Sequence, residues 1–165
     1  MIKLSRLTDY AVVVLAEMAR ASGELMAAST LATKTGIPEP TVSKVLKTMS
    51  RNGLISSVRG VSGGYRLDRA AGDISVLLII AAMEGPISLT SCVSGSHESC
   101  ALEGKCSMHG RWNPVNAAIN AALDEVTLAH MLNSSSFVIP AKAGIHSDSP
   151  QHGIESRLRG NDGEA

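Results

Sequence analysis

Apolar residues recur at spacings of three and four near the start of the chain and predict an amphipathic helix over about residues 5–20. Polar and charged residues fill the positions between them, and Gly23 follows where such a helix would end. One face of this helix is therefore expected to be buried. Its members are Leu4, Leu7, Ala11, Val14, Leu15 and Met18.

Two further helices are predicted before residue 53. A short one covers residues 29–35, and Gly36 stands where a left-handed residue commonly ends a helix. The next begins at Glu39 and Pro40, because proline fits best in the first turn of a helix, and it runs to about Asn52. Its expected buried stripe consists of Val42, Val45, Leu46 and Met49. Its outward face is small, polar and cationic, and carries Thr41, Ser43, Lys44, Lys47, Thr48 and Arg51.

A hairpin is predicted directly after this helix. Residues 54–58 and 65–67 have the composition of two short strands, and a glycine-rich turn that includes Arg59 separates them. A hairpin in this position has the layout of a β-wing.

The next two segments contrast in their hydrophobic pattern. Ser75 can cap a very apolar helix over residues 76–84, which Gly85 and Pro86 stop. From residue 87 to about 111 the periodicity disappears, and the sequence is rich in Ser, Gly and Cys. We therefore expect something other than an apolar core to order the second segment.

A last helix is predicted after Trp112, and its small apolar stripe suits close packing against another helix. Residues 134–165 have no apolar period and are rich in Ser, Gly, Pro and charge, so a disordered tail is expected there. The stripe of the last helix comprises Val115, Ala118, Ile119, Ala122, Leu123 and Val126.

Together these elements predict a mostly α fold. Residues 1–72 would form a winged helix-turn-helix domain with a small β-wing. Residues 73–133 would supply the buried helix, the cysteine-rich loop and the last long helix, and residues 134–165 the tail.

Charge is unevenly distributed along a chain that is neutral as a whole. The 15 Lys and Arg balance the 15 Asp and Glu. Residues 1–70, however, carry ten cations against five anions, whereas residues 71–133 carry two against six. The basic excess falls in the predicted winged helix, where contact with phosphate would require it.

The chain has no sequence pattern of a secretory signal or a membrane span. Asp9, Glu17 and Arg20 interrupt the first apolar run, and the apolar stretch over residues 74–83 is too short to cross a bilayer. A cytoplasmic protein is expected. Three cysteines, an odd number, are better explained in a reducing compartment as metal ligands or buried thiols than as disulfides.

A short helix, a turn and a second helix with a cationic outward face form the layout that places a recognition helix in the major groove of DNA. Lys44 and Lys47 can neutralise phosphate charge, and Arg59 on the wing can enter a minor groove. The alternative is an ordinary solvated helix face. The helix pair, the wing and the local charge excess together favour double-stranded DNA as the partner.

Cys92, Cys100, Cys106 and His109 follow the spacing C-x7-C-x5-C-x2-H in the segment that has no packing pattern. Four such ligands fit one metal site, and metal binding would supply folding energy that apolar burial cannot. The residues alone leave structural zinc and an iron–sulfur cluster equally open, with free buried thiols as a third interpretation. No nucleophile elbow, phosphate-binding loop or carboxylate pair indicates an enzyme with a small-molecule substrate.

Three groups of motif residues together resemble one known family. They are the opening Leu7-Thr8-Asp9-Tyr10-Ala11-Val12, the three cysteines, and the wing residues Asn52-Gly53-Leu54-Ile55, Ser57-Val58-Arg59-Gly60 and Gly63-Gly64-Tyr65. These resemble the Rrf2-type iron–sulfur winged-helix regulators that include IscR, NsrR and RirA, over residues 1 to about 133. Residues 104–106, 110–112 and 126–129 look most like the branch that regulates the SUF cluster-assembly operon.

The resemblance implies a homodimeric repressor that reads a near-palindromic operator and senses iron or oxidants through an iron–sulfur cluster. Cys92, Cys100 and Cys106 would hold the cluster with His109 as fourth ligand, which favours 2Fe-2S over 4Fe-4S. Asp9 of the partner subunit is the alternative fourth ligand. The alternative function is a zinc-stabilised DNA-binding or interaction module without a sensing role. The dimerisation helix would pack through Val115, Ile119, Ala122, Leu123 and Val126.

Overall fold

The computed structural model describes residues 3–60, 62–96, 100, 102 and 104–133. Within these residues it contains six α-helices, one short 3-10 helix and one two-stranded antiparallel sheet. The mostly α fold with a small β-wing is thereby confirmed. The predicted tail, residues 134–165, lies outside the described residues.

The first three helices pack against one another around the main apolar core. Ser5 caps the first helix, since its Oγ accepts the Thr8 amide hydrogen at 3.2 Å. Gly36 ends the second with a left-handed φ of 70°. All three helix ends lie within about one residue of their predicted positions. The helices are α1 (Arg6–Arg20), α2 (Ala28–Thr35) and α3 (Glu39–Arg51).

The wing is a short hairpin of β1 (Ser56–Val58) and β2 (Gly64–Arg66), with Ser57 opposite Tyr65. The first strand begins two residues later than predicted, and the second begins and ends one residue earlier. Leu54 and Ile55, predicted at the start of the first strand, are instead buried in the core before the strand begins. Their burial fixes the hairpin to the end of α3.

The wing is also fixed from its other side. Tyr65 and Met26 exchange two backbone hydrogen bonds of 2.9 Å, so β2 pairs with the chain that precedes α2. Gly64 makes this approach possible, because a Cβ atom there would lie only 2.7 Å from the Met26 carbonyl oxygen. The Gly-Gly-Tyr motif thus has a packing reason.

α4 (Val76–Glu84) packs against α1 and α3. Ser75 caps it, as predicted, by accepting the Leu78 amide hydrogen at 3.2 Å. Ile79 and Ala82 join the same buried cluster as the side chains of the first three helices. The apolar core therefore continues past residue 72, and the division of the chain there stays a prediction.

α5 (Asn113–Glu125) packs against α4, and two short elements were not predicted: η1 (Ala71–Asp73) and α6 (Leu128–Leu132). The expected stripe of the long helix is shorter than predicted, because Val126 lies beyond the end of α5 in an extended conformation. Its carbonyl oxygen accepts the Val76 amide hydrogen at 2.8 Å and so ties the chain to the start of α4.

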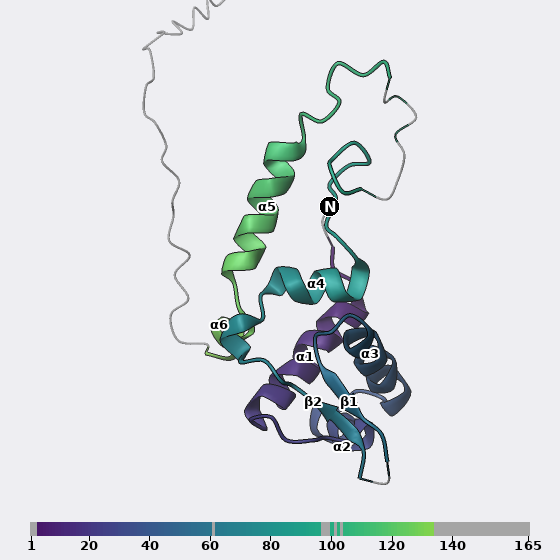
Figure 1. The fold of residues 1–165 in the computed structure, drawn as a ribbon, viewed down its shortest axis with the longest axis vertical. Coiled ribbons are helices and arrows are strands. Elements are labelled where there is room, and N and C mark those ends of the chain that lie inside the picture. The colour runs from purple at the N-terminus through teal and green to yellow at the C-terminus, as the bar shows by residue number, and fades with distance from the viewer. Residues whose placement is uncertain (1–2, 61, 97–99, 101, 103, 134–165) are drawn as a thin grey trace, which may run out of the picture.

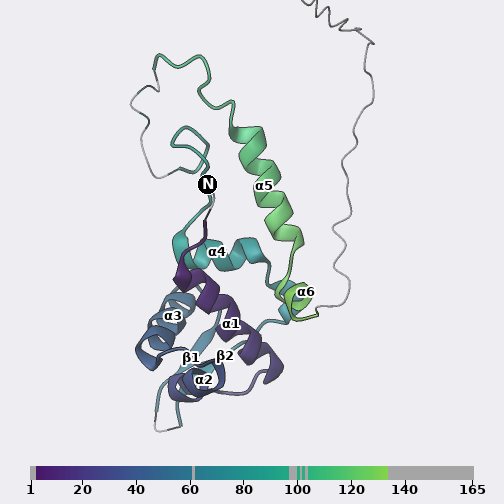
Figure 2. The same cartoon turned by 180° about the vertical axis from the view of Figure 1, so that it is seen from behind.

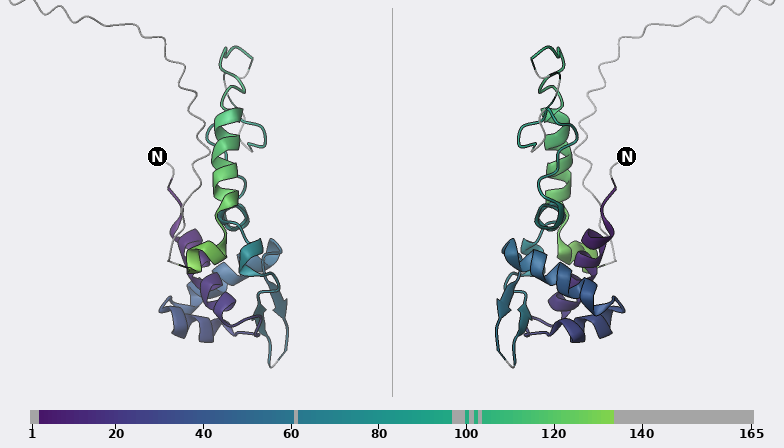
Figure 3. Two further views of the ribbon diagram at one scale, coloured as in Figure 1. Left: turned by 90° about the vertical axis from the view of Figure 1, so that its left-hand side faces the viewer. Right: turned by 90° about the vertical axis from the view of Figure 1, so that its right-hand side faces the viewer.

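Figures 1 and 2 show α5 projecting beyond α4, away from the three-helix core, while the wing lies at the opposite end of the molecule. The segments around residues 86–96 and 104–112 lie at the N-terminal end of α5, as the side views of Figure 3 also show. None of the helices in the described part of the chain is long and apolar enough to cross a membrane.

Candidate functional site

The outward face of α3 presents the predicted cationic side chains. Lys44, Lys47 and Arg51 are exposed, and Thr41, Ser43 and Thr48 between them are half-buried. The stripe predicted to be buried is fully enclosed: Val42, Val45, Leu46 and Met49. In the described residues, ion pairs join Arg20 to Glu17 and Arg66 to Asp68, and none involves a cation of α3. The charges on this face are therefore available to a polyanion.

Thr48 differs from the other hydroxyl residues of this face. Its Oγ1 donates to the Lys44 carbonyl oxygen at 3.0 Å, four residues earlier in the helix. The hydroxyl proton is thus used within the helix. Toward DNA, Thr48 is left with acceptor capacity, which suits a base amino group rather than a phosphate.

Arg59 is exposed in the turn between β1 and β2. The turn is tight, because a Cβ atom on Gly63 would lie 2.5 Å from the Val58 carbonyl oxygen. Arg59 therefore projects from a narrow hairpin, which is the shape that a groove-entering wing requires.

All three cysteines are free thiols and are half-buried. They lie in a stretch with almost no apolar core: of the described residues from 87 to 112, only Val93 is buried, at 4% exposure. Three large apolar side chains of this stretch are exposed, namely Leu102, Met108 and Trp112, and Ile87 and Leu89 are half-buried. The expectation that apolar packing does not order this segment is thus confirmed for its described residues.

Cys92 has polar neighbours that favour its thiolate form. The hydroxyl of Thr90 lies 3.3 Å from its Sγ, and together with the backbone amide of Gly110 it lowers the pKa of the Cys92 thiol below its ordinary value. Thiolate is the form that binds iron or zinc.

The chemistry of the donor set fits a thiolate-bound metal centre, since three free thiols and the imidazole of His109 occur in one segment. Within the described residues, however, no three side chains of Cys, His, Asp or Glu are already gathered as metal ligands. The residues present can therefore supply the ligands, although those that the structure describes are not held in a coordinating arrangement.

Backbone turns lead from Cys106 to α5. The amide of His109 donates to the Cys106 carbonyl oxygen at 3.2 Å, and the amide of Arg111 donates to that of Met108 at 3.1 Å. Cys106 and His109 therefore belong to one turn. The turn keeps Cys106 and His109 close to each other, as a metal site that uses both would require. The role of His109 as a ligand stays a prediction.

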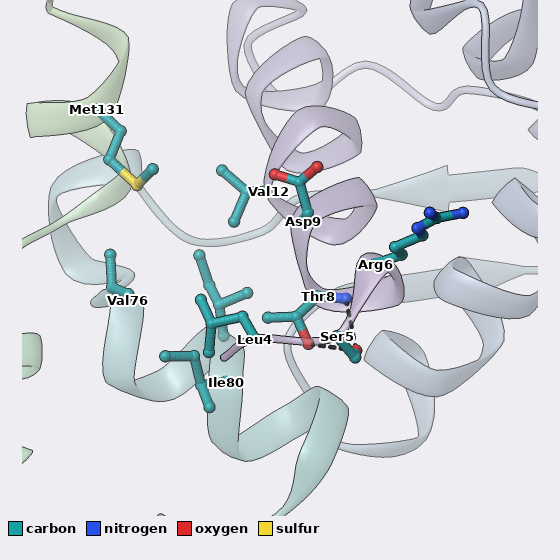
Figure 4. Close-up of a pocket in the computed structure, with 10 residues that line it drawn as sticks. Leu4, Ser5, Arg6, Thr8, Asp9, Val12, Val76, Ile80 and Met131 are labelled. Carbon is teal, nitrogen blue, oxygen red and sulfur yellow. Dashed lines mark hydrogen bonds between the residues drawn. The ribbon is translucent and has the colours of Figure 1, made fainter. Parts of the chain in front are cut away.

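Asp9, the alternative fourth ligand, lies in the first turn of α1 and not in the cysteine segment. Figure 4 shows it beside a mainly apolar cavity of about 360 Å³, between α1, α4 and α6. Val12, Val76 and Met131 also line this cavity. A ligand role for Asp9 of the partner subunit stays a prediction.

The predicted dimerisation stripe is divided in the structure. Val115 and Ala122 face outward, Val115 with 45% exposure. Ile119 and Leu123 are half-buried and line a cavity of about 350 Å³ together with Leu4, which precedes α1, and Ile80 of α4. The outward part of α5 is thus the part that remains open to a second chain.

Two polar residues of this region carry no motif in the sequence. The side chains of Asn113 and Asn116, at the start of α5, hydrogen-bond to the backbone on both sides of Cys92. The only sequence signal is their spacing of three within a helix, which places them on one face.

A family model described as Rrf2, iron-dependent transcriptional regulator, matches residues 4–134. An HTH-type transcriptional regulator of Haemophilus influenzae is 31% identical over 132 residues, which cover 79% of this chain and 87% of that protein. The HTH-type transcriptional regulator IscR of Serratia proteamaculans is 30% identical over 106 residues, which cover 64% of this chain and 63% of IscR.

Solved structures with the same fold are also transcription regulators. CymR of B. subtilis, described as its global cysteine regulator, superimposes with a TM-score of 0.61 at 25% identity, over 82% of this chain and all of CymR. IscR of T. potens gives a TM-score of 0.56 at 28% identity, over 82% of this chain and 89% of IscR.

Proposed function

The chain belongs to the Rrf2 family of iron-dependent transcriptional regulators, and from this premise we propose that it is a repressor whose DNA binding responds to an iron–sulfur cluster. Like its relatives, it is a DNA-binding regulator and not an enzyme. The observation that carries the proposal is the concentration of three free thiols in the one described segment without an apolar core.

Cys92, Cys100 and Cys106 would hold the cluster as thiolates, with His109 as the fourth ligand. Three thiolates and one imidazole favour a 2Fe-2S cluster, and 4Fe-4S is the alternative. Asp9 of the partner subunit is the alternative fourth ligand. When bound, the cluster supplies an anchor that depends on iron and oxidants for a segment that apolar burial does not order.

Two copies would pack through the outward part of α5 and present their α3 helices to a near-palindromic operator. Lys44, Lys47 and Arg51 would neutralise phosphates, and Arg59 would enter a minor groove. A change in the cysteine segment need shift the equilibrium by only about 1.4 kcal/mol to change DNA affinity tenfold. Genes for iron–sulfur cluster assembly of the SUF type are the proposed targets.

The metal content tests this proposal directly. Protein purified without oxygen should be brown and contain iron and sulfide in matched amounts, and its absorbance spectrum should distinguish 2Fe-2S from 4Fe-4S. Colourless protein with stoichiometric zinc would instead favour a zinc-stabilised DNA-binding module with no sensing role. Cys100→Ala should abolish the chromophore and leave a folded dimer. An unfolded product would indicate a purely structural metal.

DNA binding has its own test. Affinity should fall steeply with salt, and Lys47→Ala should weaken binding to all sequences alike while lowering the salt slope by about one. Lys105→Ala is the matched control, because Lys105 is equally exposed but lies outside the winged helix. Equal losses in the two variants, or binding that does not depend on salt, would contradict the assignment of α3 as the recognition helix.

A further inference from the structure

Two asparagines at the start of α5 hold the chain around Cys92. The Oδ1 atom of Asn116 accepts the Leu89 amide hydrogen at 3.0 Å, and its Nδ2 donates to the Ile87 carbonyl oxygen at 3.1 Å. Three residues earlier, the Oδ1 atom of Asn113 accepts the Ser94 amide hydrogen at 2.9 Å. The backbone is therefore attached to the helix on both sides of Cys92.

Asn116 is well suited to this role. It is 7% exposed, and Thr8 is the only other buried polar residue in the described part of the chain. Both polar ends of its amide have partners, and leaving either one unpaired inside the protein would cost about 1–3 kcal/mol. Its two hydrogen bonds thus hold residues 87–89 against α5, because moving these residues away would leave the buried amide of Asn116 unpaired.

The same end of α5 also continues the turns that follow Cys106. The Gly110 carbonyl oxygen accepts the Asn113 amide hydrogen at 3.1 Å in the turn that opens the helix. The helix start therefore positions the backbone on both sides of Cys92. Next to Cys106 the structure shows a single side-chain attachment, in which the Nε of Arg111 donates to the Ser107 carbonyl oxygen at 3.3 Å. Both of these residues are exposed, whereas Asn116 is buried.

We propose that Asn113 and Asn116 are positioning residues that hold Cys92 in place before any metal binds, so that Cys92 is the fixed donor to which the others are brought. A donor held by a rigid helix reduces the conformational entropy lost when the site assembles. The inference rests on the proposed function for the role of Cys92 as a ligand. The attachment of its backbone to α5 is independent of that role.

The test uses full-length, metal-free protein and measures amide hydrogen exchange by NMR and the alkylation rate of each cysteine by mass spectrometry. Asn116→Ala should speed exchange at Leu89 about tenfold, and Asn113→Ala should do the same at Ser94. Cys92 should react several-fold faster in both variants, while Cys100 and Cys106 keep their rates. A general loss of stability would instead change all three.

Asn120→Ala is the matched control. Asn120 lies one turn further along α5, and its Oδ1 is buried without a hydrogen-bond partner in the described structure. Its removal should leave exchange at Leu89 and Ser94 unchanged. If Asn116→Ala does not fold, Asn113→Ala decides the question, because Asn113 is only half-buried.

Iron loading separates this inference from the proposed function. Asn116→Ala should take up iron and sulfide several-fold more slowly than the wild-type protein. Wild-type protein that binds no iron would overturn the proposed function and leave the exchange results standing. Unchanged exchange at Leu89 and Ser94 in the variants would overturn the positioning role even if iron binds.

Discussion

The winged helix and the cysteine segment are held together by different forces. In the winged helix, α1, α3 and α4 enclose fully buried apolar side chains such as Leu15, Leu46 and Ile79. Between residues 87 and 112 only Val93 is buried among the residues described, and the backbone is attached by asparagine side chains. The first region is stable by apolar burial, whereas the second depends on a few polar bonds.

This difference has a functional consequence. A region held by few hydrogen bonds can change its arrangement for a few kcal/mol, while an apolar core changes only by unfolding. The cysteine segment can therefore change its arrangement while the winged helix stays folded.

The junction between the two regions is the C-terminal end of α4. The Nδ2 of Asn52, at the end of α3, donates to the Ala82 carbonyl oxygen at 2.8 Å. Glu84 accepts hydrogen bonds from the Ser5 amide at 2.9 Å and from the Thr8 hydroxyl at the start of α1. The end of α3 and the start of α1 are thus linked to the residues that lead into the cysteine segment.

The largest expected effect comes from the core. Leu46→Ala removes a side chain with no exposed surface and should lower the free energy of unfolding by about 3 kcal/mol, measured by urea denaturation. The control is Leu102→Ala in the cysteine segment, where the side chain is 64% exposed and the loss should stay within about 0.5 kcal/mol. Similar losses in the two variants would contradict the division into two kinds of region.

The wing should be sensitive to a single methyl group. Gly64→Ala places a Cβ 2.7 Å from the Met26 carbonyl oxygen and should cost about 2 kcal/mol of unfolding free energy, with a loss of DNA affinity. Gly72→Ala is the control, because a Cβ there meets no atom within 4 Å. A stable Gly64→Ala variant with normal affinity would show that the pairing of the wing with Met26 is dispensable.

The link between α3 and α4 should have an intermediate effect. Asn52→Ala removes the hydrogen bond to Ala82 and a second one of 3.0 Å to the Thr48 carbonyl oxygen, and should cost about 1 kcal/mol in the same assay. Asn133→Ala, an exposed asparagine at the end of α6, should cost almost nothing. If Asn52→Ala lowers the unfolding free energy as much as Leu46→Ala does, this polar link stabilises the protein as strongly as a core side chain.

The smallest effect concerns Glu84 and depends on pH. The hydrogen bond from the Thr8 hydroxyl is the main cause that holds the pKa of the Glu84 carboxyl below its ordinary value of 4.5, and the bond from the Ser5 amide adds to it. A lowered folded-state pKa gives stability that is present above pH 4.5 and is lost as pH falls through the folded value. Because the side chain is exposed, the contribution should be only about 0.5 kcal/mol.

Glu84→Gln tests this in metal-free protein. The stability difference between wild type and variant should be present near neutral pH and should shrink well below pH 4.5. Urea denaturation at both pH values provides the measurement. A difference that grows on acidification would mean that the carboxylate is not stabilised by α1.

The helices of the winged helix and the cationic face of α3 could be predicted from the sequence. Apolar periodicity is a local property, and α1 and α3 bury most of the side chains that their own spacing indicates. The prediction was wrong for Leu4, which lies before the start of α1 and is exposed, and Leu7 is only half-buried. Gly36 and Ser75 mark helix ends because their effects act within one turn. The loss of apolar periodicity from residue 87 to about 111 likewise predicted that the cysteine segment has almost no apolar core.

How distant segments meet follows from the packing of the helices and not from local sequence patterns. The pairing of Tyr65 with Met26, the place of Val126 beyond α5, and the contact of Asn116 with Leu89, which lies 27 residues away, depend on which backbones the packed helices bring together. A single asparagine has no periodicity, and its amide can bind any exposed backbone group. Local pattern therefore specified the elements, and their packing specified which polar groups hold Cys92.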